Sequence, residues 1–448
     1  MIDKLLIANR GEIAVRVIRT CREMGIKTVA VYSTADKGSL HTAMADESVC
    51  IGPPASKDSY LSRNNMIAAA LKTKCGAIHP GVGFLSENAD FARSARREGL
   101  VFIGPSPEVI EMLGDKVKAR AAAVKFGLPV TPGTQDAVAG DALEAVKGIG
   151  FPVIIKAAAG GGGKGMRIVR READLEEHIK IARSEALANF GDERVFIERF
   201  VEKPRHVELQ ILADGKGKVA VLGERDCSVQ KNHQKLIEES PSPGVTDAMR
   251  ERMKTGAVNM FRELGYCGAG TIEFLVENGV FYFMEVNARV QVEHPVSEFV
   301  SGVDIIRQQI LACTENTLEI DGADGGAAGA CSVRLSGWAI ECRINALSPG
   351  RVSKLTVPGG IGVRFDTFLS EGCFVPPYYD SMVGKLIVHA ANRDQALAKM
   401  ERALSELVIE GIRTNRMRQE HIIKEKTFRS GVFDTSYYES VAKEVEHV

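Results

Sequence analysis

The first 115 residues alternate between short apolar runs and longer stretches with apolar residues at helical spacing. The apolar runs predict strands at 4–8, 27–32, 77–80 and 100–104, and the helical spacing predicts a helix at 11–24. Strands that alternate with helices indicate a parallel, doubly wound sheet. Ligands bind such sheets beyond the carboxyl ends of the strands, where residues 79–83 form a loop. This loop is either a binding loop or a plain Pro-Gly turn, and the sequence favours neither.

The rest of the chain divides into a connector and two further parts. Residues 116–130 indicate a helical connector that ends in Gly127-Leu128-Pro129. Residues 131–203 predict a compact α/β unit with strands at 151–156, 166–169 and 195–199 and a helix at 172–189. Residues 204–448 predict strands at 207–213, 218–224, 338–344 and 383–389 and helices at 304–313, 394–408 and 415–424. The fold class is therefore α/β, with an α+β C-terminal part.

A predicted β-hairpin at 268–295 carries charge where strands are usually apolar. Its two apolar runs, 271–276 and 280–286, flank Glu277-Asn278-Gly279, which is a strong turn signal. Carboxylates nonetheless stand inside both runs, at Glu273 and Glu285.

The length of the turn decides whether these carboxylates meet. A two-residue turn would place Glu273 and Glu285 on opposite faces. A three-residue turn with a left-handed glycine pairs Val276 with Val280, and both carboxylates then share one face with Asn287 because side chains alternate with period two. We predict the three-residue turn, and with it an all-oxygen site of the kind that Mg²⁺ prefers. The alternative is a pair of edge carboxylates that face water.

Composition narrows the class of protein. Of 448 residues, 45% are hydrophobic and 26% are charged, which is ordinary for a soluble globular protein. A net charge of −1 argues against nucleic acid as the main partner, and no apolar run reaches the ~20 residues of a membrane helix. The nine cysteines stand singly and the chain begins directly with a strand, so we expect free thiols, no targeting segment and a cytoplasmic location.

A glycine-rich loop at 160–165 follows the strand that ends at Lys156. Consecutive glycines let backbone N–H groups close on phosphate oxygens, and a lysine at the strand end neutralises their charge. The loop leads into a strand and not into a helix, so it lacks the context of a dinucleotide-binding motif. We interpret it as a flap over a triphosphate. The alternative is a mobile hairpin exposed to solvent.

Three further segments carry the side chains of an anion site. Residues 230–235 gather cationic and amide side chains, which suits phosphate or bicarbonate. Arg289 and Glu293 stand four residues apart, where arginine would hold an anion and a buried carboxylate with a raised pKa would serve as general base. Arg343 stands among apolar neighbours on a strand, where it either stabilises a developing negative charge or forms a structural ion pair. A solvated loop and a surface ion pair are the alternatives for the first two segments.

Taken in order, these motifs make the chain resemble a biotin carboxylase of the ATP-grasp superfamily over essentially its whole length. The matching strings lie at 7–14, 79–81, 160–166, 204–208, 227–239, 285–287, 289–295, 341–345 and 376–382. Val82 and Asn232 stand where the family usually has tyrosine and arginine. The resemblance implies a three-domain ATP-grasp architecture. Its parts are an N-terminal domain at 1–115, the connector at 116–130, a lid domain at 131–203, and a C-terminal domain at 204–448 that completes the ATP site.

The resemblance also implies roles for individual residues. Those implied to bind ATP are Lys116, Lys156, Gly162, Gly163, Met166, Glu198, Arg199, Phe200, Val201, His206, Gln230, His233, Glu273, Leu275 and Glu285. Those implied to hold two Mg²⁺ or Mn²⁺ ions are Glu273, Glu285 and Asn287. Those implied to bind bicarbonate are Lys235, Arg289, Gln291, Val292 and Glu293, and Arg343 is implied to bind biotin. The implied catalytic residues are Lys235, Arg289, Arg343 and the base Glu293.

The implied reaction is the ATP- and bicarbonate-dependent carboxylation of biotin through carboxyphosphate. The sequence contains no Ala-Met-Lys-Met biotinylation string and no carboxyltransferase region, so it resembles a free-standing, homodimeric subunit. Such a subunit modifies biotin on a separate carrier protein and works with carboxyltransferase subunits. We expect an acetyl-CoA carboxylase in fatty acid synthesis, with a pyruvate or propionyl-CoA carboxylase as the alternative. Another ATP-grasp carboxylate–amine ligase and a non-catalytic nucleotide-binding subunit are less favoured.

Overall fold

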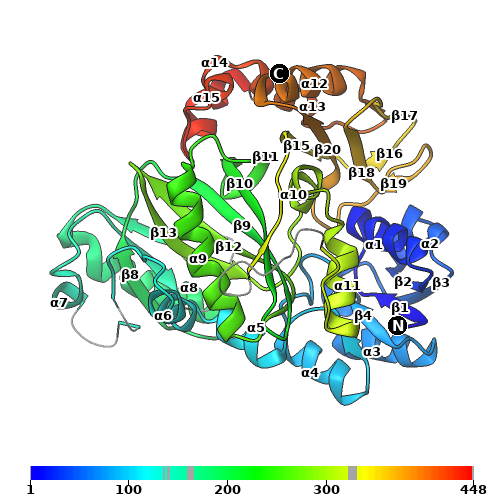
Figure 1. Cartoon of the computed structure of the whole chain (residues 1–448), viewed down its shortest axis with the longest axis horizontal. Helices are drawn as coiled ribbons and strands as arrows, with labels where there is room; N and C mark the ends of the chain where they lie inside the picture. The colour runs from blue at the N-terminus through cyan, green and yellow to red at the C-terminus, as the bar shows by residue number, and fades with distance from the viewer. Residues whose placement is uncertain (1, 135–136, 139–141, 159–165, 321–329, 446–448) are drawn as a thin grey trace.

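The structure, a computed structural model, describes residues 2–134, 137–138, 142–158, 166–320 and 330–445. The N-terminal part contains a five-stranded parallel sheet of order β3-β2-β1-β4-β5, blue and cyan at the right of Figure 1. Its strands are β1 (Lys4–Ile7), β2 (Lys27–Ser33), β3 (Glu47–Gly52), β4 (Ala77–His79) and β5 (Val101–Phe102). Its helices are α1 (Gly11–Glu23), α2 (Leu40–Met44), α3 (Arg63–Lys72), α4 (Ala89–Arg97) and α5 (Pro107–Gly114), with 3-10 turns η1 (Thr34–Asp36) and η2 (Ser56–Asp58). The predicted parallel sheet is confirmed.

The apolar run of β1 reflects its place in the middle of this sheet. Leu5, Leu6 and Ile7 are all completely buried, as expected for a parallel strand that is covered on both faces. The sequence does not predict β3, because this edge strand begins with the exposed residues Glu47 and Ser48 and lacks an apolar run.

A three-stranded antiparallel sheet of order β7-β6-β8 forms the next part, teal at the left of Figure 1. The elements from the connector onward are α6 (Lys116–Lys125), α7 (Ala142–Val146), β6 (Val153–Ala157), β7 (Arg167–Val169), η3 (Glu172–Asp174), α8 (Leu175–Phe190) and β8 (Val195–Arg199). Leu175 and Ile179 of α8 pack on Ile155 and Ile197 of the sheet. The predicted helix at 172–189 begins with the 3-10 turn η3 and continues as α8. The glycine loop 160–165 lies outside the described residues.

A nine-stranded sheet, almost entirely antiparallel, forms the centre of the molecule, with the main order β13-β12-β9-β10-β11-β15-β20-β18. These strands are β13 (Val280–Asn287), β12 (Cys267–Glu277), β9 (Arg205–Asp214), β10 (Val219–Lys231), β11 (Gln234–Ser240), β15 (Trp338–Asn345), β20 (Met382–Ala390) and β18 (Val363–Thr367). A short strand, β14 (Ala330–Ser332), pairs with β10 in parallel. The helices that belong to this part are α9 (Asp247–Glu263), α10 (His294–Ser301) and α11 (Ile305–Glu315).

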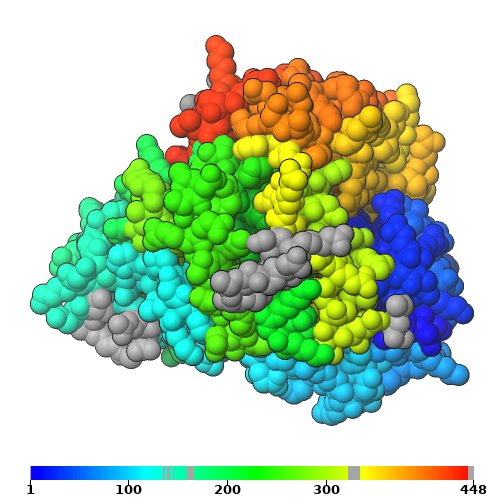
Figure 2. Space-filling view, viewed as in Figure 1, coloured from blue at the N-terminus to red at the C-terminus, as the bar shows by residue number. Residues whose placement is uncertain are grey.

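Within the described residues, the C-terminal part adds two separate two-stranded sheets and four helices beside the central sheet. It contains β16 (Gly350–Arg351), β17 (Lys354–Thr356), β19 (Phe374–Val375), β21 (Val408–Glu410), α12 (Arg393–Glu406), α13 (Arg416–Lys424), α14 (Lys426–Ser430) and α15 (Tyr437–Val445). Figure 2 shows this part, in orange and red, packed on the green central part, with the blue N-terminal part at the right. Among the described helices, none has the length and apolarity to cross a membrane.

Strand β9 gives the central sheet one apolar face and one polar face. Val207, Leu209 and Ile211 point into the core, where the core includes Met249 and Met253 of α9. The residues that alternate with them are His206, Glu208 and Gln210, which are also buried but polar. Because side chains alternate along a strand, the polar set lies together on the opposite face. The candidate site is built on that face.

The hairpin turn differs from the predicted one. Glu277 pairs with Val280, so the turn has two residues, and Asn278 and Gly279 both adopt positive φ angles of 50° and 78°. Positive φ angles at both residues are the conformation that an Asn-Gly sequence favours in a two-residue turn. The predicted three-residue turn is therefore wrong.

A β-bulge nevertheless brings the two carboxylates opposite each other. The register shifts by one residue after Phe274 pairs with Phe283, so that Glu273 pairs with Glu285. Met284 is the extra residue. Glu285 and Asn287, two residues apart, then lie on the same face as Glu273. The shared face was predicted for the wrong reason: the bulge, and not the turn, produces it.

Candidate functional site

Lys235 lies at the centre of the candidate site, where three carboxylates meet it. Its Nζ atom is 2.7 Å from Glu208 Oε2, 3.1 Å from Glu273 Oε1 and 2.6 Å from Glu293 Oε1. The carboxylates come from β9, from β12 and from the segment before α10, and all three are buried. One ammonium group does not neutralise three buried carboxylates, so further cations are required.

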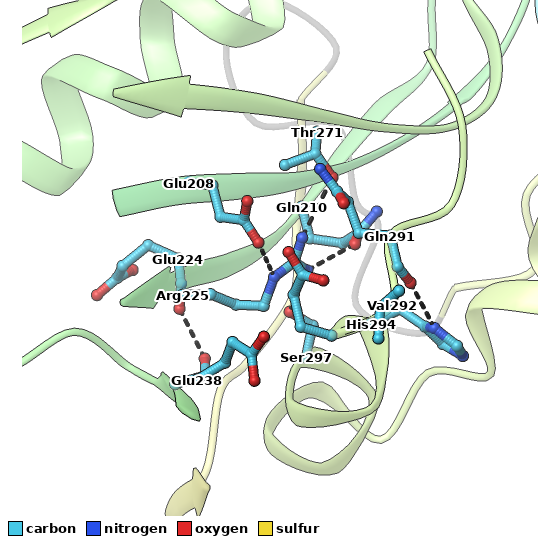
Figure 3. A network of polar contacts seen from close by, with 12 residues as sticks. Glu208, Gln210, Glu224, Arg225, Glu238, Thr271, Gln291, Val292, His294 and Ser297 are labelled. Carbon is cyan, nitrogen blue, oxygen red and sulfur yellow. Dashed lines mark hydrogen bonds and ion pairs between the residues drawn. The ribbon is translucent and has the colours of Figure 1, made fainter. Parts of the chain in front are cut away.

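Arg225, in the middle of β10, is the second cation of the cluster. Its Nε atom donates to Glu208 Oε1 at 2.5 Å, and Nη1 donates to Gln210 Oε1 at 2.6 Å and Ser297 Oγ at 3.0 Å. Nη2 donates to Thr271 Oγ1 at 3.2 Å. Figure 3 shows these four partners around the guanidinium group. Each guanidinium nitrogen has an acceptor, which satisfies a fully buried charge.

Glu293 connects this cluster to a third cation, Arg343 of β15. Its Oε1 atom accepts from Lys235 at 2.6 Å, and its Oε2 atom accepts from Arg343 Nη2 at 2.9 Å. Arg343 Nε donates to Glu238 Oε1 of β11 at 2.6 Å. Arg343 therefore forms the ion pairs that the sequence left open, while its role toward biotin stays a prediction.

Arg289 lies on the side of the site nearest the N-terminal part. Its Nε atom donates to Glu87 Oε2 at 2.8 Å, so in the described contacts its carboxylate partner is Glu87, and the alternative of an ion pair with Glu293 is not formed. Nη2 donates to Asn287 Oδ1 at 2.9 Å, and Nη1 donates to Gln291 Oε1 at 3.0 Å. These contacts hold the guanidinium group beside both amides, which were predicted to be in the site.

Glu273 collects donors from several predicted site residues. His206 Nε2 lies 2.9 Å from its Oε2 atom, while Asn287 Nδ2 at 2.9 Å and Gln291 Nε2 at 3.0 Å donate to its Oε1 atom. Glu285, directly opposite on β13, is less engaged, with Lys116 Nζ at 3.6 Å from its Oε2 atom. The predicted metal and bicarbonate residues are therefore neighbours in space.

A second polar cluster lies in the smaller sheet, on the predicted nucleotide side. Lys156 of β6 forms an ion pair with Glu198 of β8, which is buried. Arg120 Nη1 also donates to Glu198 at 2.9 Å, and Thr131 donates its hydroxyl proton to the same oxygen. The backbone of Lys116 donates to the carbonyl of Ala158 at the end of this sheet, 3.0 Å away.

Two backbone N–H groups at the end of β8 already form hydrogen bonds within the protein. The N–H groups of Arg199 and Phe200 donate to the carbonyls of Pro132, at 2.7 Å, and Pro152, at 2.9 Å. These two donors are thus already used, which limits adenine recognition there to other backbone groups. Val201 is buried directly after them.

The other predicted residues lie at varying distances from the two clusters. Leu275 pairs with His206 across β12 and β9, and Gln230 Nε2 lies 3.5 Å from His206 Nδ1. Residues 227–239 form a strand, a turn and a strand, and His233 is exposed in that turn. Met166 directly precedes β7. The backbone carbonyl of Val292 accepts a hydrogen bond from Lys385 Nζ at 2.5 Å. Gly162 and Gly163 lie outside the described residues.

The charges of the central cluster shift its pKa values in opposite directions. Burial by itself raises the pKa of Glu293, but Lys235 and Arg343 outweigh burial and hold it well below the usual range. Burial lowers the pKa of Lys235, yet the three carboxylates around it raise it well above the usual range. Burial also raises the pKa of Glu238 to about 7, with Arg343 opposing this rise. Glu293 is therefore ionised, and its pKa is lowered here and not raised as predicted for a general base, because its two cationic partners outweigh burial.

Several residues of these clusters escape prediction from the sequence. They are Glu87, Arg120, Glu208, Arg225 and Glu238. A usable signal existed for Glu208, because polar residues alternate with apolar ones along 206–211. A half-buried strand with a polar face exposed to water shows the same alternation, so the pattern alone does not identify a buried site.

The donor groups fit a hard divalent cation. Glu273 and Glu285 face each other across β12 and β13, and the partly exposed Glu285 has one amine at 3.6 Å. Carboxylate and amide oxygens are the ligands that Mg²⁺ prefers. The amide of Asn287 turns its oxygen toward Arg289, so it would have to move or flip to join such a site.

The two sheets together present lysine and arginine side chains and two facing carboxylates, which suits a nucleotide and its metal ions. The family model "Carbamoyl-phosphate synthase L chain, ATP binding domain" matches residues 115–320. The models "Biotin carboxylase, N-terminal domain" and "Biotin carboxylase C-terminal domain" match residues 1–110 and 341–440.

Similar proteins of known identity cover nearly the whole chain. "Biotin carboxylase 1" of Bacillus subtilis is 50% identical over 98% of this chain and 99% of its own length. A crystal structure of a biotin carboxylase complex from Campylobacter jejuni has a TM-score of 0.93 and 45% identity, and covers 98% of this chain and 99% of its own. The biotin carboxylase domain dimer of Hydrogenobacter thermophilus 2-oxoglutarate carboxylase, solved with MgADP, ADP and bicarbonate, has a TM-score of 0.93 and 42% identity over 99% of both chains.

The chain therefore belongs to the biotin carboxylase family. Its members are ATP-dependent ligases that use ATP and Mg²⁺ to carboxylate biotin.

Proposed function

We propose that Glu293 is the general base that activates bicarbonate for attack on ATP. The observation that carries this proposal is the position of its carboxylate, with one oxygen on Lys235 and the other on Arg343. A base in that position touches both the predicted bicarbonate clamp and the predicted biotin residue. When bicarbonate enters, its own charge competes for Lys235, which weakens the ion pair on Glu293 and raises its affinity for a proton.

The bicarbonate clamp consists of Lys235 and Arg289, with the amide of Gln291 and the backbone of Val292. Arg289 is preoriented by Glu87 and Asn287, so its guanidinium group needs little rearrangement to bind a planar anion. The deprotonated oxygen of bicarbonate attacks the γ-phosphorus of ATP, the bond between that phosphorus and the bridging oxygen breaks, and carboxyphosphate and ADP are formed. Holding the two reactants in line is most of what this step requires from the protein.

The nucleotide lies between the two clusters. The residues that contact its phosphates and its base are Lys116, Lys156, Met166, Glu198, the segment 199–201, His206, Gln230 and Leu275. Glu273, Glu285 and Asn287 would hold the metal ions, which neutralise the phosphate charge. Gly162, Gly163 and His233 are included in this proposal on the resemblance alone.

Arg343 acts in the second half of the reaction. Carboxyphosphate decomposes to CO₂ and phosphate, and the phosphate removes the N1′ proton of biotin. The guanidinium group of Arg343 stabilises the resulting enolate, which captures CO₂. Its ion pairs with Glu238 and Glu293 fix the guanidinium group in place before biotin arrives.

The proposed protein is a subunit whose biotin is bound to a separate carrier protein. We propose domains at 1–115, 131–203 and 204–448 joined by the connector 116–130, a homodimer, carboxyltransferase partners and a cytoplasmic location. Acetyl-CoA is the proposed final acceptor. The likeness to a 2-oxoglutarate carboxylase domain supports the alternative that a keto acid is the acceptor. Identification of the carrier and carboxyltransferase that co-purify with the tagged chain distinguishes the two.

The activity itself is tested with free biotin. We expect ATP hydrolysis that requires bicarbonate and rises on addition of biotin. The variant Arg343→Ala should lose carboxybiotin formation while it keeps nucleotide binding, measured by calorimetry. Full carboxylation by this variant would overturn the role of Arg343, and ATP turnover with an amine in place of biotin would overturn the reaction.

A further inference from the structure

Cys267 and Cys313 bring their thiols together away from the candidate active site. Cys267 is the first residue of β12, and Cys313 lies in the last turn of α11. Their Sγ atoms are 3.7 Å apart, and neither residue is fully buried. Two thiols at this separation, on elements that are already packed together, are close enough to react with each other.

Two glycines lie directly beside the pair and place no side chain there. Gly268 has a φ of +96°, and a Cβ atom on it would lie 3.4 Å from Cys313 Sγ. A Cβ atom on Gly215 would likewise lie 3.4 Å from Cys267 Cβ. A disulfide has an S–S distance of about 2.05 Å, so the sulfurs must approach by less than about 2 Å. Rotation of the two side chains supplies a movement of that size.

The two thiols differ in how easily they ionise. The hydrogen bond between the two thiols, helped by the positive charge of Arg96, lowers the pKa of Cys267 against the effects of burial and of Asp214. The same hydrogen bond and burial raise the pKa of Cys313 well above its usual value. Cys267 therefore ionises first and is the nucleophile of the pair, and Cys313 is the neighbouring thiol that completes a disulfide.

We propose that Cys267 and Cys313 form a modification site for peroxides, which convert the two thiols into a reversible disulfide. The Cys267 thiolate attacks one peroxide oxygen, the O–O bond breaks, and the other oxygen leaves as water after it takes a proton. The sulfur of Cys313 then attacks the sulfenic acid on Cys267, the S–O bond breaks, and a second water leaves. Each sulfur loses one electron, and hydrogen peroxide gains two. An external dithiol reverses the reaction by exchange.

The disulfide would close a loop over residues 267–313. That loop contains Glu273, the whole of β13, Arg289 and Glu293, so it encloses much of the central cluster. A cross-link of this length restricts the unfolded chain, and we expect the oxidised protein to melt several degrees higher than the reduced protein.

The test uses the full chain, reduced and then treated with hydrogen peroxide, which is removed with catalase before the free thiols are alkylated. Peptide mass spectrometry should find the segments around 267 and 313 linked, with two fewer alkylated thiols per chain. Dithiothreitol should restore both thiols and the lower melting temperature. Cys267→Ser and Cys313→Ser should abolish the link.

Cys50→Ser is the matched control, because Cys50 is exposed and contacts the carbonyl of Gly52. This variant should form the 267–313 link as the parent chain does. The proposal is overturned when peroxide oxidises Cys50 in the parent chain but leaves Cys267 and Cys313 free to alkylate. It is equally overturned when Cys313→Ser still loses two thiols and gains the higher melting temperature. Neither readout depends on carboxylation, so the result is separate from that of the proposed function.

Discussion

The two large sheets of this protein place polar groups in different ways. Strand β1 of the parallel sheet is apolar from Leu5 to Ile7, and Asn9 and Arg10 follow only after it ends. Strand β9 of the central sheet instead alternates apolar and polar residues, with Glu208 and Gln210 inside it and completely buried. A parallel sheet covered on both faces leaves its ends for function, whereas the antiparallel sheet here uses a whole face.

This difference has an energetic counterpart. In the parallel sheet, burial of apolar area stabilises the strands directly. In the central sheet, the charges of Lys235, Arg225 and the carboxylates around them must be paired before they can be buried. We therefore expect substitutions in the central face to change catalysis first, and substitutions in β1 to change stability first.

The largest effect is expected from Glu293→Gln. The amide keeps the shape of the side chain but accepts no proton, so bicarbonate-dependent ATP turnover should fall by about 10²–10⁴-fold, the usual contribution of a general base. Steady-state kinetics of purified protein, with circular dichroism as a check of folding, measure this loss.

Glu224→Gln is the matched control for Glu293→Gln. Glu224 is also a fully buried carboxylate of the central sheet, but it pairs with Arg250, at 2.7 and 2.9 Å, and makes no contact with Lys235. Its substitution should leave the turnover of the folded protein nearly unchanged. Equal losses in the two variants would mean that the network is needed for folding and not for proton transfer.

The second effect tests the parallel sheet. Leu6→Ala removes a completely buried side chain from β1, within a core that includes Val29 and Ile78. We expect a loss of about 2–5 kcal/mol in the free energy of unfolding, as for other large-to-small substitutions in cores. Urea denaturation measures this loss, and KM for ATP and bicarbonate should stay within about twofold of the parent at a temperature where the variant is folded. A large rise in KM with an unchanged free energy of unfolding would contradict the expectation that substitutions in β1 change stability before they change catalysis.

The two sheets also differ in how far they can be predicted from sequence. Apolar runs are sufficient to find β1, β2 and β4, because each strand is interpreted by itself. The exposed edge strand β3 lacks such a run. Arg225 and Glu208 satisfy each other only when β10 and β9 are paired, and no local pattern reports that pairing. The site residues that the sequence did reveal lie in strings that the family shares.

The hairpin shows the same limit at the scale of a single residue. The Asn-Gly turn was the correct local signal, and its two-residue form follows from the positive φ angles of both residues. The bulge at Met284 that restores Glu273 and Glu285 to one face depends on the register with the neighbouring strand. Bulges have weak sequence signals, so the shared face was reached through an incorrect turn.

The smallest effect concerns the pH dependence of stability and separates two carboxylates of the central face. The pKa of Glu238 is raised to about 7 in the folded protein, chiefly by burial, from an ordinary value of 4.5. The folded state therefore holds this proton more tightly than the unfolded state, and the resulting stability is complete below pH 4.5 and is lost as the pH rises through 7. Between pH 5 and 8, the parent should lose up to about 3 kcal/mol relative to Glu238→Gln, because each pKa unit corresponds to 1.36 kcal/mol.

Glu293→Gln provides the opposite slope in the same titration. The pKa of Glu293 is held well below its usual range by Lys235 and Arg343, which overcome burial, so its contribution to stability is present above pH 4.5 and is lost as the pH falls. The parent should therefore weaken relative to Glu293→Gln on acidification, as followed by urea denaturation at each pH. If the stability difference between parent and variant changes with pH in the same direction for both variants, the two carboxylates do not have oppositely shifted pKa values. The polar face would then titrate as one unit.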